Sequence, residues 1–156
     1  MEMNKFVVFS IGNAEYAFPI RWVVSIEKAE KINTIPQLPQ SIMGIVKVRE
    51  TLIPVLDFES ILYHKRIEVS DTTKLIVIQT DQEAMKASIA VNEAKEILEI
   101  SSEQINQVSL IVNIQTPYIS GIANLGSRLI TIIDPLKLLT SLEDMKQIEE
   151  YIQEYV

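Results

Sequence analysis

The sequence has no cysteine among its 156 residues, and histidine occurs once, as His64. Without cysteine, disulfides, thiol nucleophiles and thiolate metal sites are excluded. A zinc site with a single histidine would need carboxylates or waters as its other ligands, which is rare. His64 lies beside Lys65 and Arg66 in a polar stretch between the two halves, so we expect an exposed side chain rather than a catalytic base.

Glycine and long apolar runs are also scarce. The glycines are too dispersed for a phosphate-binding loop or a dinucleotide fingerprint. No stretch approaches the ~20 apolar residues that span a bilayer. The first residues run directly into an apolar strand pattern and lack the long apolar segment of a signal peptide. We therefore expect a cytoplasmic protein with no cofactor, no metal and no direct membrane insertion.

The charge balance excludes a further class of function. The formal net charge is −7, and the basic residues are scattered, with Lys65-Arg66 as the only adjacent pair. An acidic surface repels phosphate backbones, so we expect no nucleic-acid partner. Hydrophobic residues make up 47% of the chain, enough for an ordinary folded core.

Short runs rich in β-branched residues recur through the chain and repeat. The spacing that separates Gly44 from Gly121 also maps Asp57 to Asp134 without a gap. Each half therefore has the same order of elements, strands followed by a brief helical turn. The strand runs are 5–10, 16–20, 44–49 and 51–56 in the first half, and 74–79, 85–91, 118–122 and 129–133 in the second.

Short strands around an apolar interior suit a small closed barrel, because closure removes exposed sheet edges. We predict a first barrel within residues 1–66 and a second within 67–140, leaving open whether strand 5–10 crosses between them. Residues 141–156 have an apolar stripe of helical period, which predicts a helix docked on a barrel. Pro54 predicts an edge or bulged position for its strand, because proline donates no ladder hydrogen bond.

Asp57 and Asp134 invite a catalytic interpretation as a carboxylate pair. They are related by the repeat, however, and each stands where a strand gives way to a helical segment. An aspartate there accepts backbone N–H bonds as a helix N-cap. We therefore predict two structural caps, with a carboxylate-based enzyme as the alternative, and expect no catalytic residues.

Three segments in order carry a family resemblance. Residues 39–57 (PQSIMGIVKVRETLIPVLD) and 118–134 (YISGIANLGSRLITIID) resemble the two glycine-led hairpins of the CheW family of chemotaxis coupling proteins. Residues 5–20 resemble the first hairpin of that family. The resemblance extends from Lys5 to Leu139 and implies a mainly β fold, with two SH3-like five-stranded β-barrel subdomains related by an internal repeat, plus a C-terminal α-helix.

The resemblance also implies a non-enzymatic adaptor. Such a scaffold binds the cytoplasmic tip of methyl-accepting chemotaxis receptors and the regulatory domain of the chemotaxis histidine kinase, and is recruited from the cytoplasm to membrane receptor arrays. Its implied receptor-binding residues here are Arg49, Val23, Ile26, Gly44 and Val46. We assign kinase binding to Ile35 and Leu38, because apolar residues exposed on a loop often mark a protein-binding surface.

The turn at Lys47-Val48-Arg49-Glu50 departs from the family's Asn-Leu-Arg-Gly. If the usual glycine has φ > 0, Glu50 is strained there or the turn has changed type. Glu50 could also pair with Arg49 or Lys47. Two alternatives to a coupling protein stay open: the adaptor domain of a CheV-like protein without its receiver, and an unrelated SH3-like binding module such as an RNA-binding barrel pair.

Overall fold

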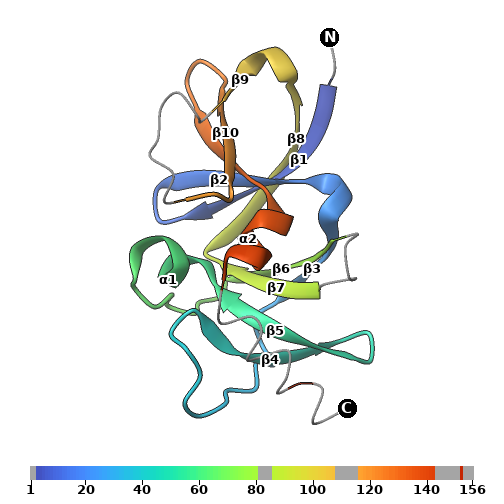
Figure 1. The fold of residues 1–156 in the computed structure, drawn as a ribbon, viewed down its shortest axis with the longest axis vertical. Coiled ribbons are helices and arrows are strands. Elements are labelled where there is room, and N and C mark those ends of the chain that lie inside the picture. Colours follow the sequence, from blue (N-terminus) through green and yellow to red (C-terminus); the bar gives the residue numbers. More distant parts are fainter. Residues whose placement is uncertain (1–2, 81–85, 108–115, 143–151, 153–156) are drawn as a thin grey trace.

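The computed structural model describes residues 3–80, 86–107, 116–142 and 152. These residues form a mainly β structure with short helical segments between strands (Figure 1). The strands are β1 (Met3–Ile11), β2 (Ala14–Pro19), β3 (Val23–Lys28), β4 (Ile42–Val48), β5 (Thr51–Asp57), β6 (Lys74–Gln79), β7 (Lys86–Val91), β8 (Glu93–Ser101), β9 (Ile105–Gln107), β10 (Ile119–Asn124) and β11 (Leu129–Ile133). The helices are α1 (Phe58–Tyr63) and α2 (Pro135–Ser141), and the 3-10 turns are η1 (Ile20–Trp22) and η3 (Ser102–Gln104).

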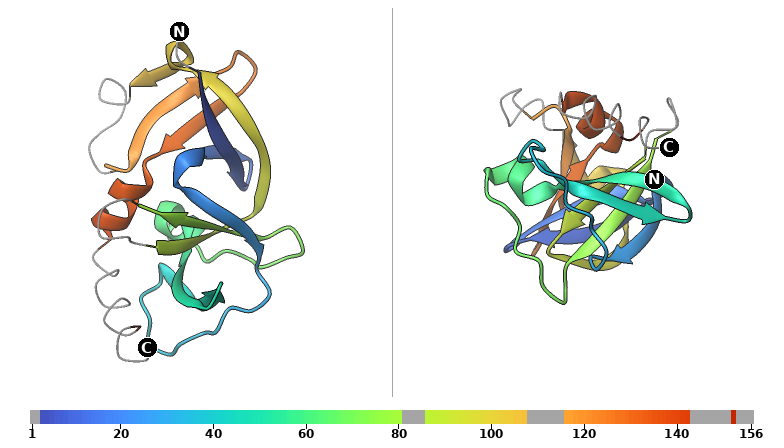
Figure 2. Two further views of the ribbon diagram at one scale, coloured as in Figure 1. Left: turned by 90° about the vertical axis from the view of Figure 1, so that its right-hand side faces the viewer. Right: turned by 90° about the horizontal axis from the view of Figure 1, so that it is seen from below.

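The strands form two curved sheets, one above the other in Figure 1 and in the left view of Figure 2, and confirm the predicted fold class. The six-stranded sheet β8-β1-β2-β11-β10-β9 forms what we term the upper barrel. The five-stranded sheet β3-β6-β7-β5-β4 forms the lower barrel. In each, one parallel pair, β2 with β11 or β5 with β7, joins antiparallel neighbours.

The two barrels exchange strands, so they do not coincide with the sequence ranges 1–66 and 67–140. The upper barrel takes β1 and β2 from the first half of the chain, and the lower barrel takes β6 and β7 from the second. The crossing left open for strand 5–10 is therefore present, because β1 pairs with β8 along its length. The strand exchange also includes β2, and it runs in both directions, because each barrel contains two strands from the other half of the chain.

Repeat-related residues perform the same structural task in both barrels. The ladder between β4 and β5 shifts register between Ile42 and Gly44, and that between β10 and β11 shifts between Ile119 and Gly121. At both glycines the backbone of another segment approaches so closely that a Cβ would collide with it or with a neighbouring side chain. Close approach therefore explains why the repeat preserves glycine.

Pro54 corrects one expectation, because β5 lies between β4 and β7 and is not an edge strand. Pro54 is paired with Ile45, whose backbone N–H and C=O both bond to Asn33 at 2.9 and 2.8 Å. Ile45 therefore needs no donor from position 54. The parallel ladder to β7 begins only at Val55, so Pro54 removes no hydrogen bond on that side either.

Strand alternation builds three apolar clusters. In β1, Phe6 and Val8 point into the upper barrel, whereas Val7 and Phe9 point into a core shared by both barrels. In β6, Leu75 and Val77 likewise fill the lower barrel, while Ile76 and Ile78 enter the shared core. Because both faces of these strands are buried, they are continuous apolar runs rather than alternating ones.

The predicted N-caps are both confirmed. The Asp57 carboxylate accepts from the backbone N–H of Ser60 at 3.0 Å and caps α1, and it also accepts from Ile67 N–H at 2.9 Å. Asp134 caps α2 by accepting from Lys137 N–H at 3.2 Å. Asp57 is fully buried, so its second bond anchors the segment between the sequence halves.

Only part of the predicted C-terminal helix falls within the described residues. Leu142 and Ile152, both on its apolar stripe, pack against the shared core, as expected for a docked helix. The rest of the stripe, at 145, 148 and 156, lies outside the described residues.

Candidate functional site

The shared core reaches the surface along two outermost strands, β3 and β8. Ile26 on β3 lies directly opposite Ile76, and Ile97 on β8 lies directly opposite Val7. Ile76 and Val7 are both buried in the shared core. Directly opposed side chains project from the same face of a sheet, so Ile26 and Ile97 extend the core outward at the junction of the barrels.

These residues are unusually exposed for their type. Ile26 retains 43% of its accessible surface and Ile97 retains 57%. Val23 is half-buried against the shared core, and Ile20 in η1 is 36% exposed. Strand β8 also contacts β6, the neighbour of β3, so the two edges belong to one region. We term Ile20, Val23, Ile26 and Ile97 the junction surface.

Val23 and Ile26 were predicted from the sequence, whereas Ile20 and Ile97 were not. Ile20 precedes Val23 by the same interval that separates Val23 from Ile26, a spacing that could have drawn attention to it. Ile97 lies in a strand flanked by Glu96 and Glu99, where the local pattern gives no indication of its partner strand. Only the pairing of β8 with β1 places it at the junction.

The hairpin between β4 and β5 presents Arg49 to solvent at its tip. Arg49 and Glu50 have φ of 49° and 69°, so both central residues of the turn are left-handed. Such a turn matches the twist of a two-residue hairpin but is unfavourable for side chains other than glycine and asparagine. Glu50 pairs with Lys47 at 3.4 Å, one of the two partners expected, and both side chains are largely exposed.

Gly44 and Val46, also implied as receptor-binding residues, are buried. Val46 packs inside the lower barrel with Val55 and Val77. A Cβ at Gly44 would lie 2.1 Å from the carbonyl oxygen of Asn33. Both residues therefore support the hairpin from within, and we leave them out of the binding surface proposed below.

Ile35 and Leu38 lie on the loop between β3 and β4. Both are half-buried and pack against the shared core. The bridge between Asn33 and Ile45 fixes the start of this loop against β4. The hairpin tip that carries Arg49 lies at the far end of β4 from the point where this loop enters the strand (Figure 1).

A cluster of charged side chains braces the upper barrel. Arg128 donates to Glu15 from Nε at 3.0 Å and from Nη2 at 2.8 Å, and Nη2 also lies 2.8 Å from Glu96 Oε1. The hydrogen bonds from Arg128 hold the pKa of Glu15 below its ordinary value, against the opposing effect of burial. The cluster ties β2, β8 and the turn before β11 together.

Burial favours the neutral form of two tyrosines, Tyr16 and Tyr118. The hydroxyls of Tyr16 and Tyr63 are 2.5 Å apart, and burial is the main cause that raises the pKa of Tyr16 far above its usual value. Burial likewise raises the pKa of Tyr118. The bond between Tyr16 and Tyr63 ties the end of α1 to β2.

Within the described part of the chain, no group of three or more histidine or acidic side chains is arranged to hold a metal ion. Across the same residues, no helix combines the length and apolar character needed to cross a membrane. What the described surface offers instead is an apolar region with charged flanks, which suits protein binding.

Comparison with known proteins agrees with this description. The CheW-like domain family matches residues 5–143. The chain is 28% identical to the chemotaxis protein CheW of Klebsiella aerogenes, over 90% of this chain and 84% of that protein. It is 29% identical to the chemotaxis protein CheW of Bacillus subtilis, over 84% and 83% of the two chains.

A solved structure has the same fold. The scaffolding protein TtCheW from Thermoanaerobacter tengcongensis superposes with a TM-score of 0.75 at 28% identity, covering 85% of each chain. The family match spans both barrels and both glycine-led hairpins. The chain therefore belongs to the CheW-like family of chemotaxis scaffold proteins.

Proposed function

We propose that this protein couples methyl-accepting chemotaxis receptors to the chemotaxis histidine kinase by binding both. The junction surface takes the helical tip of a receptor, with Arg49 at the hairpin tip as a further receptor contact, and the loop carrying Ile35 and Leu38 takes the regulatory domain of the kinase. In this proposal the protein is recruited from the cytoplasm to membrane receptor arrays. The observation that carries it is the continuation of the shared core into exposed Ile26 and Ile97.

The junction surface suits an apolar helical partner. Its members come from η1, β3 and β8, and the occupant that we propose is a helix lying across these elements. Burying one such isoleucine side chain completely is worth about 1.5–3 kcal/mol, so partial burial of several gives moderate affinity. Moderate affinity is sufficient in an array, where many such contacts act together.

The lower barrel offers a second, separate surface. Ile35 and Leu38 remain partly accessible on the loop between β3 and β4. Accessible apolar side chains of this kind are frequent at protein interfaces. Arg49 stands at the hairpin tip, away from this loop, so its effect on each partner can be measured separately.

The junction surface is tested by Ile26→Asp. We expect this variant to bind a receptor cytoplasmic fragment at least tenfold more weakly, because it places a charge where an apolar contact forms. Leu129→Asp is the matched control, since Leu129 is 64% exposed on β11 of the upper barrel. Binding is measured by calorimetry, and far-UV circular dichroism checks folding.

The hairpin tip is tested by Arg49→Glu, with the receptor fragment and the kinase regulatory domain titrated separately. The expected result is weaker coupling to one partner with an unchanged thermal transition, because Arg49 is exposed. The proposal is wrong if Ile26→Asp binds the receptor fragment normally, or if Leu129→Asp loses as much affinity.

A further inference from the structure

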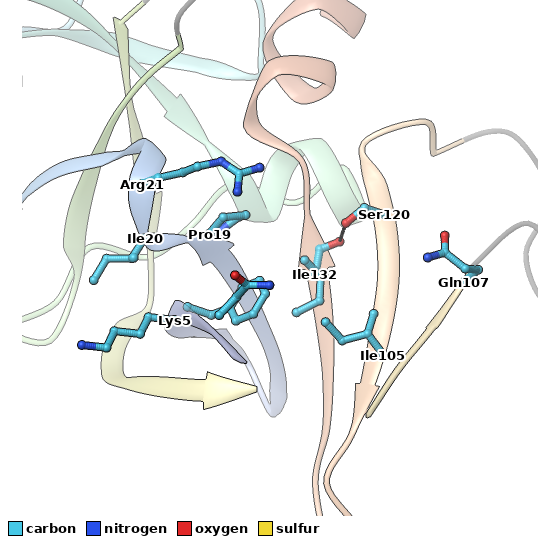
Figure 3. Close-up of a pocket in the computed structure, with 10 residues that line it drawn as sticks. Lys5, Pro19, Ile20, Arg21, Ile105, Gln107, Ser120 and Ile132 are labelled. Carbon is cyan, nitrogen blue, oxygen red and sulfur yellow. Dashed lines mark hydrogen bonds between the residues drawn. The ribbon is translucent and has the colours of Figure 1, made fainter. Parts of the chain in front are cut away.

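A groove of about 470 Å³ opens on the upper barrel next to the junction surface. Figure 3 shows its two walls: Lys5, Pro19, Ile20 and Arg21 on one side, and Ile105, Gln107, Ser120 and Ile132 on the other. The groove forms because β2 and β11 pair only as far as Ala17 and Ile132. Beyond that point the two walls separate.

The charge of this groove is opposite to that of the protein. Its only charged lining residues are Lys5 and Arg21, both cationic, in a chain with net charge −7. Within the described residues neither side chain forms an ion pair. Glu99 lies directly opposite Lys5 in register, so Arg21 is the less compensated of the two.

Arg21 is positioned to receive an anion. In Figure 3 its guanidinium extends toward the opposite wall, and its Cζ lies 5.1 Å from the ring centroid of Trp22. Stacking on an aromatic face orients the guanidinium while leaving its N–H donors free at the edge. A planar fork of this kind recognises a carboxylate with two parallel hydrogen bonds.

The rest of the groove is amphipathic. Ile105 and Ile132 contribute apolar surface, while Asn4 and Gln107 contribute amide groups. The hydroxyl of Ser120 is already used, since it donates to the carbonyl of Ile132 at 3.3 Å. Such a lining suits a protein segment with apolar side chains and an acidic one, rather than a small polyanion.

We propose that this groove binds a carboxylate-bearing side chain of the same receptor helix that lies on the junction surface, with Arg21 as its main contact and Lys5 at the rim. The inference rests on the proposed function. Two observations select this occupant: Ile20 belongs both to the groove and to the junction surface, and the groove is cationic. The acidic contact then fixes the register of the helix along the apolar residues.

The test uses the full chain and a receptor cytoplasmic fragment. Arg21→Gln combined with Lys5→Gln is expected to weaken binding by about three- to tenfold at low salt, the range for two exposed charge contacts. Lys31→Gln combined with Lys137→Gln changes the net charge equally at two exposed lysines outside the groove and should have no effect. Raising the salt concentration should remove the difference.

Tryptophan fluorescence gives a second and direct measurement of binding. Trp22 is the only tryptophan, and Arg21 stacks on it, so receptor binding should change the tryptophan emission of the wild-type protein. Arg21→Lys, which keeps the charge but loses the fork, should bind with intermediate affinity. A receptor fragment with its tip glutamates replaced by glutamine should no longer distinguish wild type from Arg21→Gln, as a double-mutant cycle requires.

The outcomes separate the two proposals. If Ile26→Asp abolishes binding while the groove variant matches the lysine control, the groove proposal is overturned and the junction surface stands. If Ile26→Asp binds normally, the proposed function fails together with the groove. If the groove variant binds more weakly at every salt concentration alike, the contact is not electrostatic and the inference is also refuted.

Discussion

Replacing Gly44 by alanine would place a methyl group where the backbone of the β3–β4 loop already lies. The new Cβ would be 2.1 Å from the carbonyl oxygen and 2.9 Å from the carbonyl carbon of Asn33. These are backbone atoms, so no side-chain rotation can relieve the collision. The loop must move away from β4 by more than 1 Å for ordinary contact to return.

That movement has a calculable cost. Asn33 and Ile45 exchange two backbone hydrogen bonds, of 2.8 and 2.9 Å, and both would be lost. At about 0.5–1.5 kcal/mol for each bond, plus some loss of packing, we expect Gly44→Ala to lower the free energy of unfolding by about 2–4 kcal/mol. For a chain of this length that corresponds to a fall in Tm of about 5–12 °C.

The internal repeat supplies the control. At Gly121 the nearest atom to an added Cβ is a methyl carbon of Ile105, at 2.7 Å, and the Asn106 carbonyl oxygen is 3.0 Å away. The Ile105 side chain can change rotamer, so we expect Gly121→Ala to cost only about 1–2 kcal/mol. Thermal and urea unfolding followed by circular dichroism measure both. The reasoning is refuted if Gly44→Ala unfolds no earlier than Gly121→Ala, or keeps its Tm while losing receptor binding.

Two further predictions concern charged groups. Asp57→Ala should lower the free energy of unfolding in urea by about 2–4 kcal/mol, because two buried N–H groups lose their acceptor. Asp134→Ala removes a more accessible cap and should cost about 1 kcal/mol, so equal losses would contradict the assigned roles. Because Arg128 lowers the pKa of Glu15 in the folded state, the stability that this pair contributes is present above about pH 4.5 and is lost as the pH falls through the folded-state value. Urea unfolding of Arg128→Gln against wild type across this range should show the difference shrinking toward low pH, and a difference independent of pH would exclude the ion pair as its cause.

Much of the fold could be predicted from local sequence. The repeat located Gly44 and Gly121, and the strand-to-helix transitions identified Asp57 and Asp134 as caps, because these roles depend on a few neighbouring residues. The charge pattern of the hairpin also anticipated the pairing of Glu50 with Lys47. Each of these features is encoded within a short segment.

Local sequence patterns could not predict which distant strands pair with one another. Alternation and β-branched residues indicate that a strand has buried faces, yet they do not say which strand lies beside it. Strands β3 and β8 were not located from the sequence, and they carry most of the junction surface. The same limit explains why Val46 was assigned to a partner although it faces the interior of the lower barrel.

The exchanged strands make the two barrels one thermodynamic unit. Releasing β1 from the upper barrel also withdraws Val7 and Phe9 from the core that supports the lower one. We therefore expect the two barrels to unfold together, and a ligand held by either one to shift their common folding equilibrium. On the proposed function, a receptor bound to one face would thereby also stabilise the face that the kinase binds.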